Sequence, residues 1–310
     1  MNSATVASSA TDDWLALVIG NTRLHWGAFR AGQLASVWHT PHLARDWVAR
    51  IQSSGFDAEV WKRVPGLSYS AVPKDLAPKD LAPKDLQSLH QPQSLWLASV
   101  VPEQTALWAN RRAADSDERQ RASTYVVERS QIPLQNIYPT LGIDRAINLL
   151  GAGHTVGWPV LVVDAGTALT FTAGVAQSVV GGAILPGMQM QAQGLSQRTA
   201  ALPAEANWLS GQNFSNTAWP QKLPNRWAMT TPDAIASGLI YGTLSSLQDY
   251  LSDWWQQYPE GKVVLTGGDG LALQALWQQK TPEMASRVSV DSYLMFAGMQ
   301  RYRSGAMLLL

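Results

Sequence analysis

The chain has 310 residues but no cysteine, and only 15% of its residues are charged. The absence of thiols excludes disulfide scaffolds, thiolate zinc sites, iron–sulfur clusters and cysteine nucleophiles. The 23 basic and 23 acidic residues give a formal net charge of zero, with no block of Lys or Arg. Such a chain lacks the field that attracts nucleic acid or an anionic membrane, so we expect neither as a partner.

Long hydrophobic runs are also missing. The apolar run from Trp14 to Ile19 is too short for a signal peptide or a membrane helix. Hydrophobic residues still make up 46% of the chain, which is enough to form a sizeable core. The composition therefore predicts a globular, cytoplasmic protein with roughly two domains.

Several common catalytic motifs are absent from the sequence. There is no G-x-x-x-x-G-K-[ST] phosphate loop, no G-x-G-x-x-G after a strand, no G-x-S-x-G and no H-E-x-x-H. The five histidines show no metal-binding spacing, and each is expected to be an ordinary surface or hydrogen-bonded residue. They are His25, His39, His42, His90 and His154.

One local pattern occurs twice, about half a chain apart. A buried strand at Leu15–Ile19 leads into the turn Gly20-Asn21-Thr22, and a strand at 159–163 leads into Asp164-Ala165-Gly166-Thr167. An outgoing strand follows each turn, which is typical of a hairpin. The repetition predicts two similarly built α/β domains, residues 14–157 and 158–310, after a disordered lead-in at 1–13.

Other segments complete this organisation. Apolar spacing predicts helices at 42–54, 144–150 and 188–198, and Thr231 followed by Pro232 predicts a helix start with Thr231 as its N-cap. Residues 73–86 repeat the unit Pro-Lys-Asp-Leu-Ala, whose regular prolines forbid a long helix. We interpret this repeat as a surface insertion. Further strands are expected at 95–101, 169–172 and 262–265, and a charged helical segment at 111–121.

Asp164 and its turn are the first chemical candidates. A carboxylate at the end of a buried strand needs a partner, which is often a cation. A turn rich in Gly and Thr can present backbone N–H groups and hydroxyls to a phosphate. In the alternative interpretation, Asp164 and Thr167 only hydrogen-bond within their own turn.

Asp144 and Arg145 form the second candidate, at the head of a predicted helix. An Asp in a first turn is favoured by the helix dipole alone, which is the structural explanation for it. In the functional explanation, Arg145 binds a substrate carboxylate and Asp144 lies near a substrate hydroxyl.

Taken in order, these segments resemble the type III pantothenate kinases, members of the superfamily of acetate and sugar kinases, the 70-kDa heat-shock proteins and actin. Seven collinear pieces between residue 14 and about residue 270 carry the resemblance. They are Gly20-Asn-Thr22, Ala98-Ser-Val-Val-Pro102, Gly142-Ile-Asp-Arg145, Asp164-Ala-Gly-Thr167, Gly181-Gly-Ala-Ile-Leu-Pro-Gly187, Thr231 seven residues before Gly238, and Leu265-Thr-Gly-Gly268.

The resemblance implies an actin-like architecture of two ribonuclease H-like domains, each with a central mixed sheet. It implies ATP-dependent phosphorylation of pantothenate, the first step of coenzyme A biosynthesis, by a homodimer that uses Mg²⁺ with ATP and a monovalent cation, K⁺ or NH₄⁺. Asp144 is then the general base, Arg145 binds the substrate carboxylate and Asp164 binds the cation. Further pantothenate contacts fall on Tyr138, Gly142, Ile143 and Thr231. ATP contacts fall on Val18, Ile19, Gly20, Asn21, Thr22, Arg23, Leu24, His25 and Thr167.

One position departs from the family pattern. The family's first turn reads D-x-G-N-T, but this chain has Val18 where the family has Asp. A valine cannot coordinate Mg²⁺, directly or through water. Two alternatives therefore stay open: a catalytically impaired binding protein of the same fold, like the Bvg accessory factor-type relatives, and a superfamily kinase for another small hydroxyacid or sugar.

Overall fold

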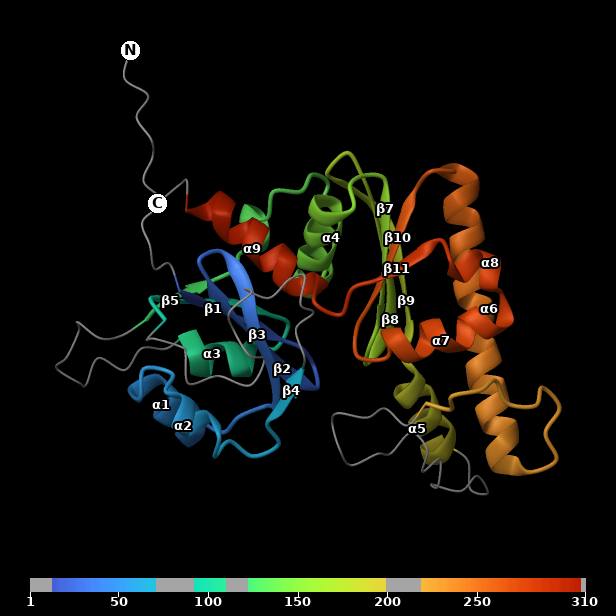
Figure 1. Cartoon of the computed structure of the whole chain (residues 1–310), viewed down its shortest axis with the longest axis horizontal. Coiled ribbons are helices and arrows are strands. Elements are labelled where there is room, and N and C mark those ends of the chain that lie inside the picture. The colour runs from blue at the N-terminus through green and yellow to red at the C-terminus, as the bar shows by residue number, and fades with distance from the viewer. Residues whose placement is uncertain (1–12, 71–91, 110–121, 199–218, 308–310) are drawn as a thin grey trace, which may run out of the picture. The chain divides into compact units, whose positions relative to one another are not determined.

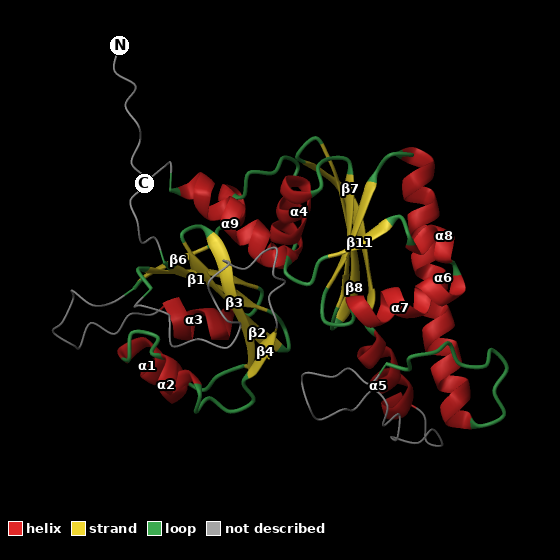
Figure 2. Ribbon diagram, in the orientation of Figure 1, coloured by secondary structure: helices red, strands yellow, loops and turns green. Residues whose placement is uncertain are grey.

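The computed structural model describes residues 13–70, 92–109, 122–198 and 219–307. The chain divides into two compact units, Met1–Gln131 and Ile132–Leu310, and each contains one mixed sheet with helices (Figures 1 and 2). The predicted α/β class with a mixed sheet in each half is confirmed. Several segments of the sequence analysis lie outside the described residues: most of the lead-in (1–12), the repeat at 73–86 and the charged segment 111–121.

The first unit is built on a six-stranded sheet with the order β4-β3-β2-β1-β5-β6. Strand β1 pairs antiparallel with β2 and parallel with β5, so the predicted hairpin around Gly20 is confirmed. The strands are β1 (Trp14–Ile19), β2 (Arg23–Arg30), β3 (Gln33–Pro41), β4 (Ser68–Ser70), β5 (Ser94–Ser99) and β6 (Ser123–Val126); the helices are α1 (Arg45–Ser53), α2 (Ala58–Trp61) and α3 (Pro102–Ala109), with a 3₁₀ turn at Arg129–Gln131.

The second unit is built on a five-stranded sheet with the order β11-β10-β7-β8-β9. Its strands are β7 (Val160–Ala165), β8 (Ala168–Val175), β9 (Ser178–Pro186), β10 (Lys262–Thr266) and β11 (Val288–Val290). Its helices are α4 (Ile143–Thr155), α5 (Met188–Arg198), α6 (Thr231–Gln257), α7 (Gly270–Lys280), α8 (Pro282–Ala285) and α9 (Leu294–Ala306). No helix in the described ranges is long and apolar enough to cross a membrane.

Five strands of the first sheet and the five strands of the second share one topology, and the first sheet adds β4 at its edge. In each sheet the first strand is central, the next two strands continue antiparallel on one side, and two parallel strands lie on the other. The duplication predicted from the two glycine turns is therefore present in the strand order. Val18 and Asp164 occupy equivalent positions in the two sheets. Each is the penultimate residue of the central strand, two residues before the turn glycine.

Four tryptophans form the centre of the first unit's core. Trp26, Trp38, Trp61 and Trp108 are fully buried, and the ring centroids of Trp26 lie 4.8 Å from those of both Trp61 and Trp108. Edge-to-face aromatic pairs at such distances add to the stabilisation from apolar burial. This cluster holds α2 and α3 against the sheet that carries the Gly20 turn.

Helices cover both faces of the second unit's sheet. The core between the sheet and α6 contains Leu161 and Phe171 together with Ile240 and Leu247. The opposite face carries α4, with α9 packed against α4, as Figure 1 shows. These two helices approach closely because Gly151 and Gly298 face each other; a Cβ on Gly298 would overlap the Ile147 carbonyl oxygen.

The boundary between the units differs from the expected one at 157/158. Helix α4 lies in the second unit, Ile132–Leu310, rather than in the first. The reason is packing: α4 contacts β7 and β8, which directly follow it in the chain, and above all α9, which lies near the end of the chain. An apolar helix face in the sequence does not reveal which sheet it covers.

Candidate functional site

The polar cluster of the second unit forms where α4 begins beside the end of β7. Asp164 follows four buried apolar residues of β7, and its side chain faces α4. The Asn148 amide donates a hydrogen bond from Nδ2 to Asp164 Oδ2 at 3.0 Å. Asn148 lies four residues after Asp144, and this helical spacing places both on the same side of α4. The sequence analysis did not single out Asn148, although this spacing was visible in it.

Asp144 sits in the first turn of α4, whose N-cap is Gly142. Its Oδ1 accepts the backbone N–H of Arg145 at 2.8 Å. A Cβ on Gly142 would overlap this oxygen, so the glycine makes room for the carboxylate. Desolvation raises the pKa of Asp144, while the N–H and the charge of Arg145 act in the opposite direction. A carboxyl with this balance can exchange a proton more readily than a fully solvated aspartate.

Arg145 is buried, with 7% of its surface exposed, and it is held by three hydrogen bonds. Its Nε donates to Thr172 Oγ1 at 2.9 Å, one Nη to the Phe171 carbonyl at 2.8 Å and the other Nη to the Tyr138 hydroxyl at 3.1 Å. A guanidinium has five N–H groups, so one remains on each terminal nitrogen. A guanidinium with one N–H group left on each terminal nitrogen has the groups needed to bind a carboxylate with two parallel hydrogen bonds.

Gly182 explains how so large a side chain fits here. A Cβ at this position of β9 would overlap both the guanidinium of Arg145 and the carbonyl oxygen of Phe171. The glycine-rich segment 181–187 of the sequence forms the second half of strand β9 and the residue after it, and Gly182 is opposite Thr172 in the sheet. Glycine at this point therefore lets the arginine lie flat along the sheet.

Asp164 carries the largest electrostatic perturbation of an acidic group in the described chain. The side chain is half-buried, and desolvation followed by the charge of Asp144 raises its pKa from 3.8 to about 7. The Asn148 amide and the charge of Arg145 oppose this rise. Ionising two neighbouring carboxylates costs electrostatic free energy unless a positive charge lies beside them.

The residues around Asp164 fit a monovalent cation. Asn148 is buried, and its Oδ1 has no hydrogen-bond partner among the described residues. An orphaned amide oxygen beside a carboxylate supplies two oxygen donors, which suits a hard cation of low charge. Within the described residues there is no group of three or more His, Asp or Glu that could hold a metal ion without other ligands.

Three glycine segments meet at the turn after Asp164. The Gly166 N–H bonds the Ala168 carbonyl, and the Gly187 N–H bonds the Thr167 carbonyl, both at 3.0 Å. Any Cβ on Gly187 would overlap the Gly166 and Thr167 carbonyl oxygens, and one on Gly267 would overlap Asp164 Oδ1. Thr167 is exposed at the tip. The turn is therefore packed against glycine backbone and the Asp164 carboxylate, and Thr167 at its tip is exposed.

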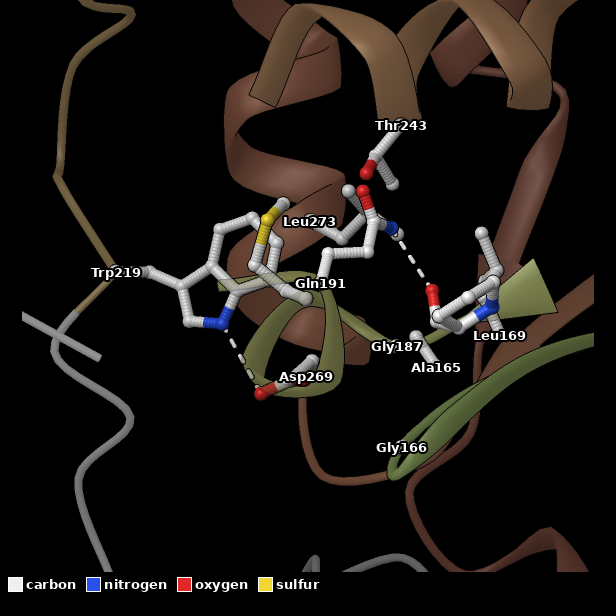
Figure 3. Close-up of a pocket in the computed structure, with 11 residues that line it drawn as sticks. Ala165, Gly166, Leu169, Gly187, Gln191, Trp219, Thr243, Asp269 and Leu273 are labelled. Carbon is white, nitrogen blue, oxygen red and sulfur yellow. Dashed lines mark hydrogen bonds between the residues drawn. The ribbon is translucent and has the colours of Figure 1, made fainter. Parts of the chain in front are cut away.

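A pocket lies behind this turn (Figure 3). Its walls are largely apolar, and Trp219 closes one side by donating from Nε1 to Asp269 Oδ1 at 3.0 Å. On the opposite side Gln191 donates to the Pro186 carbonyl at 2.8 Å. The lining residues are Ala165, Gly166, Leu169, Pro186, Gly187, Met188, Gln191, Trp219, Thr243, Asp269 and Leu273.

The first unit presents a similar turn without a carboxylate. Gly20 donates its N–H to the Arg23 carbonyl at 3.0 Å, and its own carbonyl accepts from His42 Nε2 at 2.8 Å. Asn21 and Thr22 are exposed, and Arg23 and His25 are half-buried. The expected ATP segment also includes three core side chains, Val18, Ile19 and Leu24, which are at most 3% exposed. Any ligand contact from these three comes from the backbone.

The structure brings together most of the predicted substrate residues. Gly142, Ile143, Asp144 and Arg145 form the start of α4, and Tyr138 reaches it through the Arg145 hydrogen bond. Thr231 is not part of this cluster. Thr231 is exposed on the first turn of α6, and α6 covers the face of the sheet opposite to α4 (Figure 1).

The predicted cap of α6 was wrong by one residue. Thr230 is the N-cap, and its Oγ1 accepts the Asp233 N–H at 3.3 Å. Thr231 is the first helical residue and Pro232 follows it. Both threonines of the Thr-Thr-Pro-Asp segment match the N-cap pattern. Only Thr230 lies three residues before Asp233, and this spacing lets its side-chain oxygen accept the Asp233 N–H, which has no partner within the helix.

The raised pKa of Asp164 predicts how stability depends on pH. Between about pH 4 and pH 7 the folded protein keeps a proton on Asp164 that the unfolded chain has released, so stability falls as the pH rises. We expect the free energy of unfolding of the wild type, compared with Asp164→Asn, to fall by ~2–4 kcal/mol over this range. Urea denaturation in choline buffers, which lack alkali cations, measures it. Parallel curves for the two proteins contradict the raised pKa.

Known proteins match this chain over nearly its whole length. The family model for type III pantothenate kinase matches residues 69–253. A type III pantothenate kinase from Nostoc sp. (strain PCC 7120 / SAG 25.82 / UTEX 2576) is 38% identical over 301 residues, which cover 96% of this chain and 97% of that protein. One from Synechocystis sp. (strain ATCC 27184 / PCC 6803 / Kazusa) is 37% identical, covering 94% and 91%.

A solved structure supports the fold. A conserved putative Baf family transcriptional activator from Campylobacter jejuni superposes with a TM-score of 0.53 at 17% identity, covering 95% of this chain and 99% of that one. The family model and the curated relatives, taken with the site geometry, lead to one assignment: this chain belongs to the type III pantothenate kinase family.

Proposed function

We propose that this protein transfers the γ-phosphoryl group of ATP to the primary hydroxyl of pantothenate, the first step of coenzyme A biosynthesis. The observation that carries the proposal is the Asp144–Arg145 pair at the start of α4, a proton acceptor beside a guanidinium with two open N–H groups. Family membership supplies the substrate that has both matching groups, a hydroxyl and a carboxylate. Its substrates are soluble metabolites, which supports a cytoplasmic location.

The two side chains divide the work. The Arg145 fork binds the pantothenate carboxylate, and because three hydrogen bonds already fix the guanidinium, little orientation is lost on binding. Successive residues on a helix point about 100° apart, so Asp144 and Arg145 address different ends of an elongated substrate. Few sugars carry the carboxylate that this fork requires. The binding-protein alternative rests on Val18, and the Asp144–Arg145 pair argues against it because a pure binding protein does not need a proton acceptor.

The chemical step needs one proton acceptor and an ordered phosphate. The hydroxyl oxygen forms a bond to the γ-phosphorus as the bond to the ADP oxygen breaks, and the hydroxyl proton goes to the Asp144 carboxylate. ADP leaves with the electron pair of the broken bond. Mg²⁺ bound with ATP would neutralise negative charge on the phosphate oxygens during this transfer.

Replacement of Asp144 by Asn tests the role of the base. This variant keeps the shape of the side chain and loses the proton acceptor, so kcat should fall by roughly 10²–10⁴-fold with little change in ATP binding. A coupled ADP assay with pantothenate, run beside a panel of sugars and hydroxyacids, measures it. Asp249→Asn, an exposed carboxylate of α6, is the matched control.

Two outcomes would contradict this scheme. One is near-normal turnover by Asp144→Asn. The other is a wild-type protein that binds pantothenate without phosphorylating it, which would favour the binding-protein alternative and implicate Val18.

We further propose that Asp164 and the Asn148 Oδ1 hold a monovalent cation, K⁺ or NH₄⁺. Support comes from the half-buried carboxylate, its repulsion by Asp144 and the unpartnered buried amide oxygen. A bound cation would offset the negative charge of the two carboxylates, which would otherwise repel an anionic triphosphate.

Salt exchange tests this cation site in two ways. Turnover should rise when K⁺ or NH₄⁺ replaces Na⁺ at constant ionic strength, because the site suits a large monovalent ion. The thermal midpoint should rise with K⁺ in the absence of any substrate, since a ligand that binds only the folded state stabilises it. Asp164→Asn should lose both responses. Equal turnover and equal midpoints in all three salts would exclude the site.

Pantothenate contact by Thr231 requires a second copy of the chain. Thr231 lies on α6, which packs on the Phe171 face of the sheet, whereas Arg145 lies on the Thr172 face. Neighbouring residues of a strand point to opposite faces, so the sheet of one chain separates the two side chains. We therefore propose an active homodimer in which Thr231 reaches the partner's pantothenate site.

Mixing two inactive variants tests sharing of the site between subunits. Asp144→Asn lacks the base, and Thr231→Arg blocks the contact with a large charged side chain. In a mixed dimer one site carries both changes and the other carries none, so random mixing should restore about a quarter of wild-type turnover. Each variant alone, at the same concentration, is the control. Activity no higher than the mean of the two parents would show that Thr231 does not act across the dimer.

A further inference from the structure

Three strands of the first unit carry a chain of polar side chains that ends at the Gly20 turn. His25 on β2 and His39 on β3 are directly opposite each other in the sheet. Their Nδ1 atoms lie 3.0 Å apart in a hydrogen bond, and the rings meet edge to face with centroids 4.9 Å apart. His39 Nε2 is in turn hydrogen-bonded to Ser70 Oγ on β4 at 2.9 Å.

The outer end of this chain is His25 Nε2. His25 pairs with Val18 across β1 and β2, and a Cβ on Gly20 would lie 3.8 Å from His25 Nε2. Within the part of the chain that the structure describes, this nitrogen has no hydrogen-bond partner. In the second sheet the place of Val18 belongs to Asp164. The first turn therefore has an imidazole nitrogen beside it where the second turn has a carboxylate.

The hydrogen bonds restrict the protonation of both rings. A bond between two Nδ1 atoms needs one donor and one acceptor, so the two imidazoles cannot both be cationic. Burial, His39 and Arg23 lower the pKa of His25 to about 3, and burial and Arg23 lower that of His39 to about 4. Both rings are therefore neutral near pH 7.

Two arrangements of protons then satisfy the chain. In one, Ser70 donates to His39 Nε2, His39 donates from Nδ1 to His25, and His25 carries its hydrogen on Nε2. In the other, every donor and acceptor is reversed, and His25 Nε2 is an acceptor. Only the first arrangement offers an N–H group at the Gly20 turn, and an anionic oxygen at that turn selects it.

We propose that His39 and Ser70 are positioning residues for ATP binding: they hold Nδ1 of His25 as an acceptor, so that His25, one of the ATP contacts implied by the family resemblance, presents its Nε2 N–H to a phosphate oxygen at the Gly20 turn. This proposal rests on the proposed kinase function. His25 is a ligand-binding residue, and His39 and Ser70 are positioning residues. This chain has Val18 where the family has Asp, so no carboxylate lies beside the Gly20 turn at that position. The N–H donor of His25, which pairs with Val18 across the sheet, offers a different polar group there.

Variants that keep or remove single nitrogen atoms test the chain. His25→Leu has similar bulk and no donor, and should raise both the Kd of a non-hydrolysable ATP analogue and the KM for ATP by roughly 10–100-fold. The KM for pantothenate should stay unchanged. His25→Gln places an amide N–H near the Nε2 position and should return both values to within about threefold of wild type. His154→Leu, at an exposed site on α4, is the control.

The positioning role has its own pair of variants. His39→Leu should raise the KM for ATP by about 3–10-fold without moving the KM for pantothenate, whereas His39→Asn keeps a partner for His25 Nδ1 and should restore it. A loss of packing alone would not be rescued by the smaller asparagine. Circular dichroism confirms that each variant is folded.

Nitrogen NMR of the wild-type protein tests the tautomer without any substitution. With ¹⁵N-labelled histidine, Nε2 of His25 should be protonated in the complex with the ATP analogue. An unprotonated Nε2 there, or wild-type analogue affinity in His25→Leu, would overturn the inference even if pantothenate is phosphorylated. Conversely, His25-dependent binding of the analogue by a protein that never phosphorylates pantothenate would overturn the proposed function and leave this inference standing.

Discussion

The buried guanidinium of Arg145 joins the first turn of α4 to strand β8, and the rest of the second unit's site is arranged around it. A charge can be buried only if hydrogen bonds replace its water. Thr172, the Phe171 carbonyl and Tyr138 provide these bonds, and Gly182 leaves the space. With these contacts fixed, α4 can start at only one place on the sheet. That start in turn sets where Asp144 and Asn148 meet Asp164.

The two units show how one strand order can carry two glycine turns with different polar neighbours. Both turns follow the central strand of a sheet with the same topology, and both are closed by a backbone hydrogen bond from the turn glycine. The second turn stands beside the carboxylate of Asp164. The first stands beside His25 and offers no negative charge. The difference arises from one residue of the central strand and one of the strand next to it.

Much of the fold could be predicted from the sequence because its signals are local. Short apolar runs ending in glycine turns predicted β1 and β7, and their repetition predicted the duplicated architecture. The sequence also predicted Asp144, Arg145 and Asp164, since charged residues next to apolar runs are conspicuous. What it could not show depends on pairing between distant residues. The assignment of α4 to the second unit needs α9, which lies near the end of the chain.

The polar contacts that complete each site were also hidden by distance along the chain. Thr172 reaches Arg145 across 27 residues, and His25 meets His39 only because β2 and β3 pair in one register. A shift of that register by one residue would turn one ring to the other face of the sheet and break the contact. The histidines looked unremarkable in sequence because no fixed spacing marks a cross-strand pair. The hairpin turn at Ala31 and Gly32, both at positive φ, therefore helps fix a polar contact several residues away from it.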